Sequence, residues 1–245
     1  MGVSSLLTDL LYPPACLLCH APRPATGSLR GTAVICRGCA VRLRPSGPPV
    51  CARCGVGVPG AFDAVMECRA CRQRPPAFDA ARAPWAYTDA AREAVHRFKY
   101  QRRWRLGRWL ASEMASAAAA AFPVEEVSAV LPVPQHWLTR RLRGFHGAGR
   151  LAEAVARSLG KPCLTSALRC RRRTATQSRL PWRARVRNVR GAFAANQRLV
   201  RHRTVLLVDD VLTSGATADA CARALKAAGV RRVFVLAAAR TPRAP

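Results

Sequence analysis

The sequence predicts an α/β fold in which a parallel sheet is flanked by helices and preceded by a small zinc-binding domain. Short apolar runs, such as residues 205–208, are separated by stretches of helical length, which is typical of a parallel sheet covered by helices. Eight of the eleven cysteines form four Cys-x-x-Cys pairs near the start of the chain. The 245 residues suit one α/β domain, expected at residues 77–245, and a small appendage at residues 1–76.

The composition is that of a globular chain, with 50% apolar and 22% charged residues. The sequence has no run of about 18 apolar residues that would predict a membrane span. The first dozen residues lack the basic segment that begins a secretory signal. Leucines and a valine within residues 3–11 share one helical face, so we expect a short N-terminal helix there.

The formal net charge of +28 comes almost entirely from arginine. Residues 154–208 contain fourteen basic residues and no acidic residue. Arginine binds phosphate groups in a planar, bidentate way and stacks on bases, so this charge favours pyrophosphate, nucleotides or single-stranded DNA as ligands. The alternative is an arginine-rich composition that leaves solvated surface charge without a ligand.

The cysteine pairs predict structural zinc. Two Cys-x-x-Cys pairs together supply the four thiolates that a tetrahedral Zn²⁺ ion needs, and a set of four cysteines leaves no open position for catalysis. Sequential pairing would give two zinc ribbons, at residues 16–39 and 51–71, and crossed pairing is the alternative. The four pairs are Cys16/Cys19, Cys36/Cys39, Cys51/Cys54 and Cys68/Cys71. Cys163, Cys170 and Cys221 lack such spacing and are expected to be unpaired, partly buried thiols.

After a Pro-Pro linker, residues 79–87 are expected to be extended and residues 91–100 helical. Lys99 lies near the C-terminal end of that helix and is a candidate phosphate ligand, with a solvated lysine as the alternative. Apolar residues at helical spacing and an alanine tract predict a second helix, which Pro123 ends. Residues 127–133 predict a buried strand.

A basic loop that contains glycines, residues 140–149, follows this strand and precedes a helix at residues 151–159. Loops at the carboxyl ends of strands lie on the edge where open α/β sheets bind ligands. A further strand is expected around residues 163–169. Residues 171–193 have few apolar and no acidic residues, which predicts a mobile, arginine-rich lid rather than core. Its polar positions Gln177, Arg185 and Asn188 are candidates for ligand contacts.

The remaining motif, residues 204–217, predicts a phosphate site. A buried strand leads to Asp209 and Asp210, and a turn of small and hydroxyl residues then precedes a helix at about residues 218–228. Amide groups at a helix N-terminus bind anions, and the turn consists of Thr213, Ser214, Gly215, Ala216 and Thr217. The two acids are placed to accept hydrogen bonds from vicinal sugar hydroxyls, directly or through Mg²⁺. Together, a phosphate and a diol indicate ribose 5-phosphate. The last strand is expected at residues 233–239.

The motif VLLVDDVLTSGAT resembles the 5-phosphoribosyl-1-pyrophosphate (PRPP) motif of type I phosphoribosyltransferases. Four motifs follow one another in the order typical of the ComF family, which this chain therefore resembles over nearly its whole length. They are the cysteine pairs, VLPVP…RRLRGF, QSRL…R…NVRGAF and the motif VLLVDDVLTSGAT. The resemblance implies a type I phosphoribosyltransferase fold behind a double zinc ribbon, in a cytoplasmic bacterial protein connected with uptake of single-stranded DNA. It also implies that Arg140, Arg141 and Arg143 are candidates to grip pyrophosphate, with surface arginines without a function as the alternative.

We therefore expect an enzyme that binds Mg²⁺–PRPP and transfers the phosphoribosyl group to an acceptor that the sequence does not identify, with release of pyrophosphate. Asp209 and Asp210 would hold the ribose, and catalysis would be positional and electrostatic. One alternative is an accessory protein that binds single-stranded nucleic acid and whose PRPP site is regulatory or vestigial. A regulator that senses PRPP without turnover is the third hypothesis.

Overall fold

The computed structural model describes residues 15–22, 34–47, 49–58, 60, 66–101, 104–138, 141, 145–172 and 182–242. Its helices are α2 (Arg37–Val41), α3 (Arg69–Gln73), α4 (Asp89–Gln101), α5 (Trp104–Ala121), the 3₁₀ helix η1 (Val124–Glu126), α7 (Gly147–Ser158), α8 (Trp182–Val189), α9 (Gln197–Val200) and α10 (Ala216–Ala227). Its strands are β1 (Ala80–Arg82), β2 (Trp85–Ala86), β3 (Ala129–Pro132), β4 (Leu168–Cys170), β5 (Phe193–Ala195), β6 (Thr204–Leu212) and β7 (Arg232–Arg240).

The main sheet is parallel and has the order β1, β7, β6, β3. In the register, Leu206 of β6 lies between Val130 of β3 and Phe234 of β7. Strand β2 also pairs with β7, beyond the end of β1. The parallel sheet flanked by helices that the sequence predicts is confirmed.

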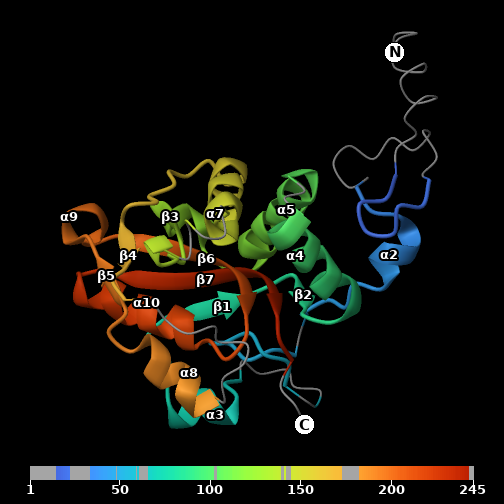
Figure 1. The fold of residues 1–245 in the computed structure, drawn as a ribbon. Coiled ribbons are helices and arrows are strands. Elements are labelled where there is room, and N and C mark those ends of the chain that lie inside the picture. Colours follow the sequence, from blue (N-terminus) through green and yellow to red (C-terminus); the bar gives the residue numbers. More distant parts are fainter. Residues whose placement is uncertain are drawn as a thin grey trace.

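The central strand β6 is buried on both faces because its apolar residues alternate between two cores. Leu206 and Val208 pack with side chains of α4, α5 and α7, whereas Val205 and Leu207 pack with side chains of α10. Figure 1 shows the same layers, with α4, α5 and α7 on one side of the sheet and α10 on the other. A continuous apolar run is the pattern expected of a strand covered on both faces.

The two cysteine-rich segments join different cores. Cys16 and Cys39 pack with the side chains of the α4 and α5 face, and Cys51 and Cys71 pack with those of the α10 face. In Figure 1, α2 accordingly lies beside α4 and β2, and α3 lies near α8 below the sheet. The two segments therefore belong to cores on opposite faces of the same sheet.

Two expectations about the second half of the chain were wrong. The strand expected around residues 163–169 is shorter and lies at residues 168–170, where it pairs antiparallel with β5 outside the main sheet. The expectation that residues 171–193 contribute nothing to the core was also wrong, because Val189 and Ala192 are buried; the segment contains helix α8, and its role as a lid stays a prediction.

The predicted N-terminal helix within residues 3–11 lies outside the described residues. In the part of the chain that the structure covers, no helix is long and apolar enough to cross a membrane.

Candidate functional site

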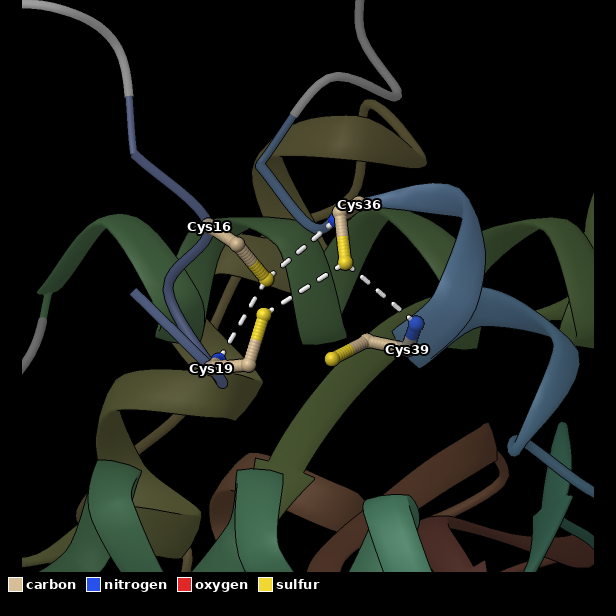
Figure 2. Close-up of side chains that lie close together, drawn as sticks. All are labelled: Cys16, Cys19, Cys36 and Cys39. Atoms are coloured by element: carbon tan, nitrogen blue, oxygen red, sulfur yellow. Dashed lines mark hydrogen bonds between the residues drawn. The ribbon is translucent and has the colours of Figure 1, made fainter. Parts of the chain in front are cut away.

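The first cysteine cluster consists of Cys16, Cys19, Cys36 and Cys39, whose sulfur atoms lie within 4.8 Å of one another. The Cys16 sulfur accepts hydrogen bonds from the backbone N–H groups of Cys19 (3.5 Å) and Cys36 (3.2 Å). The Cys36 sulfur accepts one from the N–H of Cys39 (3.4 Å). Figure 2 shows the four side chains converging on one point, with Cys39 at the start of α2. Such N–H donors stabilise thiolates, the form in which cysteine binds a metal.

The second cluster consists of Cys51, Cys54, Cys68 and Cys71, whose sulfur atoms also lie within 4.8 Å of one another. The Cys51 sulfur accepts hydrogen bonds from the N–H groups of Cys54 (3.4 Å) and Cys68 (3.3 Å). All four residues are buried, whereas Cys19 of the first cluster is exposed. Both clusters fit structural Zn²⁺, since each offers four sulfurs around one point, and the structure selects the sequential pairing.

The pKa of the Cys54 thiol is lowered to about 4. The hydrogen bond from Cys71 is the largest cause, and the positive charge of Arg240 also contributes. The same hydrogen bond raises the pKa of Cys71, so without metal the pair shares one proton, which zinc binding displaces. Of the three remaining cysteines, Cys221 is fully buried, while Cys163 and Cys170 are half-buried, and all three are free.

Asp209 and Asp210 lie near the carboxyl end of β6, which continues to Leu212 and so extends further than the apolar run predicts. Asp209 turns one carboxylate oxygen back onto the chain and accepts a hydrogen bond from the N–H of Asp210 (2.8 Å). The Asp210 carboxylate contacts the Lys99 ammonium group at 2.7 Å. Lys99 therefore reaches this edge of the sheet from α4, and in this structure its partner is a carboxylate.

Burial and the neighbouring charges shift the pKa values of Asp209 and Lys99. Burial raises the pKa of Asp209 to about 7; the charge of Asp210 adds to the rise, and the charge of Lys99 opposes it. Burial favours neutral Lys99, but the attraction of Asp210 prevails, so the pKa of Lys99 is raised. The site thus has a firmly charged ammonium group and a carboxylate whose charge changes near neutral pH.

The turn that follows β6 has the geometry of a helix N-terminus. Gly215 has φ of +80°, a left-handed conformation that favours glycine, and it is the N-cap of α10. The Ser214 hydroxyl oxygen accepts a hydrogen bond from the N–H of Ala216 (3.3 Å). Helix α10 begins two residues earlier than predicted, so Ala216 and Thr217 belong to its first turn. The first N–H groups of a helix lack acceptors within the helix, which leaves them available to an anion here.

Helix α7 begins beside the two aspartates. A Cβ atom added to Gly147 would lie 3.7 Å from an Asp210 carboxylate oxygen and 3.4 Å from the Phe98 ring. The His146 ring donates from Nε2 to the carbonyl oxygen of Val133 (3.0 Å), which ties the start of α7 to the end of β3. Helices α4 and α7 thus both lie against the carboxyl end of β6.

The structure describes only part of the predicted pyrophosphate and lid residues. Arg140, Arg143 and Gln177 lie outside the described residues. Arg141 is exposed, and Arg185 lies within α8. Their proposed role in holding pyrophosphate therefore stays a prediction. The backbone carbonyl of Asn188 accepts a hydrogen bond from Arg172 (3.0 Å).

Sequence reasoning missed Arg240, the last residue of β7, which is only 6% exposed. Its guanidinium donates to the carbonyl oxygens of Leu212 (2.8 Å) and Thr213 at the start of the turn. It also donates to the carbonyl oxygen of Cys54 (3.1 Å). The one available signal was an arginine at the end of a run of seven apolar residues, 233–239, where a buried charge needs acceptors.

The chain is similar to known proteins in both parts. Residues 7–72 match the family described as double zinc ribbon domain, and residues 146–244 match the phosphoribosyl transferase domain. The chain is 28% identical to competence protein F of Haemophilus influenzae, over 84% of this chain and 90% of that protein. It is 32% identical to DNA utilization protein YhgH of Salmonella typhimurium, over 95% of this chain and 99% of that protein. For YhgH of Escherichia coli the identity is 30%, with the same coverage.

Proposed function

Because this chain belongs to the ComF family of competence protein F and DNA utilization protein YhgH, we propose that it binds Mg²⁺–PRPP and transfers the phosphoribosyl group to an acceptor. The observation that carries this proposal is the order of groups along one sheet edge. Two carboxylates at the end of β6 are followed by the left-handed Gly215 and the N-terminus of α10. Acceptors for a diol and donors for a phosphate thus lie within a few residues of each other.

Each group has a role in this proposal. The turn 213–217 holds the 5-phosphate through N–H groups and hydroxyls. Asp209 and Asp210 accept hydrogen bonds from the ribose hydroxyls, and their oxygens are also the ligand type that Mg²⁺ prefers. Bound Mg²⁺ would supply charge neutralisation of the departing pyrophosphate. Arg140, Arg141, Arg143, Gln177 and Arg185 are the candidates for the protein's own contacts with pyrophosphate.

Lys99 has two functions in the proposed reaction. Without ligand, its ammonium group neutralises Asp210 and keeps the neighbouring carboxylates from repelling each other. With ligand, Asp210 turns to the ribose hydroxyls, and Lys99 becomes available to the pyrophosphate oxygens. A positive charge placed where negative charge develops stabilises the transition state.

The test is titration calorimetry of Mg²⁺–PRPP into the purified protein and into Asp210→Asn. We expect the substitution to weaken binding about tenfold or more, since it removes a charged acceptor. Asp89→Asn, which changes a half-exposed carboxylate at the start of α4, is the matched control. Equal affinities of the three proteins would refute the proposal. Pyrophosphate release with a mixture of bases and nucleotides then tests turnover.

One observation favours a second function, the binding of single-stranded nucleic acid. Tyr100 and Trp104 are 64% and 48% exposed, and the Arg150 guanidinium lies 5.0 Å from the centre of the Trp104 ring. Exposed aromatic rings beside arginines stack on bases and contact phosphates. We expect the affinity for single-stranded DNA to fall steeply with salt and to decrease in Trp104→Ala. No binding at physiological salt would exclude this function.

The remaining proposals concern organisation and location. We place the boundary between the zinc-ribbon part, residues 1–76, and the phosphoribosyltransferase-like part, residues 77–245, after the Pro-Pro linker. We place the protein in the cytoplasm, because eight free thiols arranged for metal need a reducing compartment. The names of its relatives favour the DNA-uptake machinery as a partner.

A further inference from the structure

Arg240 is a buried charge that no carboxylate balances within the part of the chain that the structure describes. It lies at the end of β7, donates hydrogen bonds to three backbone carbonyl oxygens, and also interacts with the Cys54 thiol, whose pKa it helps to lower. A buried arginine is retained only where its donors are satisfied, because an unpaired charge in the interior is strongly destabilising. The position of its three acceptors therefore indicates what Arg240 does.

These acceptors belong to two different structures. Leu212 ends the central strand and Thr213 begins the phosphate turn, whereas Cys54 belongs to the second cysteine cluster. One guanidinium group thus connects the cluster directly to the turn. Arginine suits this bridge, since its planar fork holds several acceptors in fixed directions.

The second cluster is also fixed to the edge of the sheet, so the position of Cys54 is well determined. The N–H of Ala81 in β1 donates to the carbonyl oxygen of Arg53 (2.7 Å), and Arg82 donates to that of Ala52 (2.8 Å). A Cβ atom added to Gly55 would lie only 2.3 Å from the carbonyl oxygen of Ala81. A change in the cluster loop therefore has to move either β1 or Arg240.

Among the described residues, no hydrogen bond joins the first cluster to the phosphate turn. Besides its apolar packing on α4 and α5, this cluster is hydrogen-bonded to Arg97 of α4, which donates to the carbonyl oxygen of Leu17 (3.5 Å) and to the His20 ring (2.7 Å). Lys99 lies two positions further along α4, so the two side chains point away from each other. The first cluster thus serves as an internal control for the second.

We propose that Arg240 is a positioning residue that couples metal binding at the second cysteine cluster to the shape of the phosphate turn, residues 213–217. Four thiolates with one Zn²⁺ carry a net charge of about −2, which offsets the buried guanidinium. Loss of the metal removes the link between Cys54 and the other three cysteines and leaves less negative charge beside the guanidinium. Arg240 then no longer holds the carbonyl of Thr213, and the turn loses its anion-binding geometry. This inference rests on the proposed function, because it regulates the same phosphate site.

The test compares Cys68→Ser, Cys19→Ser and Arg240→Gln in the full chain. Zinc per chain, measured by plasma mass spectrometry, should fall from two to one in each cysteine variant and stay at two in Arg240→Gln. We expect the affinity for Mg²⁺–PRPP to fall about tenfold or more in Cys68→Ser and Arg240→Gln and to change less than about twofold in Cys19→Ser. The double variant Cys68→Ser/Arg240→Gln should bind no more weakly than either single variant, because both changes break one connection.

Hydrogen–deuterium exchange of residues 209–218 gives a readout that needs no ligand. Exchange should rise in Cys68→Ser and Arg240→Gln and stay unchanged in Cys19→Ser. Wild-type protein that fails to bind PRPP would refute the proposed function, and the exchange result would still decide the coupling. Unchanged exchange and affinity in Arg240→Gln, or equal effects of the two cysteine variants, would overturn the inference.

Discussion

Asp209 is the residue whose environment most clearly makes the stability of the fold depend on pH. Its pKa is raised to about 7, above its value of about 4 in an unfolded chain, because burial disfavours the charged form. The native state therefore holds this proton more tightly than the unfolded state does. It follows that the Asp209 carboxylate destabilises the fold progressively as the pH rises from about 4 to about 7, and fully above that.

We expect Asp209→Asn to relieve this destabilisation. The variant should gain more free energy of unfolding relative to wild type at pH 8 than at pH 5, by about 1 kcal/mol or more. Urea unfolding at the two pH values measures the difference, with Asp89→Asn as the exposed control. A gain of the same size at both pH values would show that Asp209 titrates normally.

Lys99 should influence the pH at which the site becomes able to bind PRPP. Its charge lowers the pKa of Asp209, so Lys99→Met should raise that pKa further. If PRPP binding needs the ionised carboxylate, its affinity falls as the pH drops through the pKa, and the midpoint should move to higher pH in the variant. Calorimetric titrations between pH 6 and pH 9 measure the midpoint. Lys161→Met, which changes an exposed lysine bonded to the Glu125 carbonyl, should leave it in place.

At the scale of elements, helix α10 offers a matched pair of glycines. Gly215 before its start and Gly229 after its end both have positive φ, +80° and +84°. Alanine at either position should reduce the free energy of unfolding by about 1 kcal/mol, because a Cβ atom disfavours the left-handed conformation. Only Gly215→Ala should also weaken PRPP binding, since it displaces the N–H groups that face the phosphate. Thermal unfolding and calorimetry separate the two effects, and equal losses of affinity would argue against a phosphate site at the turn.

The elements of the main sheet were predictable from sequence because each is a local apolar pattern. Strands β3, β6 and β7 are continuous apolar runs, and α5 is an alanine-rich tract that ends before Pro123. The segment from Arg171 to Phe193 was not predictable in this way, because its helix α8 packs on α10, which follows later in the sequence. Local polarity predicted a segment without core residues, whereas tertiary contacts bury part of it.

At the scale of the whole molecule, the sequence predicted which cysteines bind together but not where the clusters would lie. The spacing of Cys-x-x-Cys pairs is a local signal, whereas packing on opposite faces of the sheet depends on long-range contacts. The same limit explains why the role of Arg240 was not predicted, since its acceptors at Cys54 and Thr213 lie far from it in the sequence. Site residues in the β6 motif were found because they are contiguous.

The different burial of the two clusters leads to a last prediction, on metal removal. Cys19 is exposed and Cys36 is half-buried, whereas all four cysteines of the second cluster are buried in the core beneath the sheet. A chelator reaches a metal ion through its exposed ligands, so zinc should leave in two phases, with the first cluster losing its ion faster. A dye that binds released zinc follows both phases. Cys19→Ser should abolish the fast phase alone, and loss of the slow phase instead would reverse the assignment. The second phase should coincide with faster hydrogen–deuterium exchange of residues 209–218, because Arg240 connects that cluster to the phosphate turn.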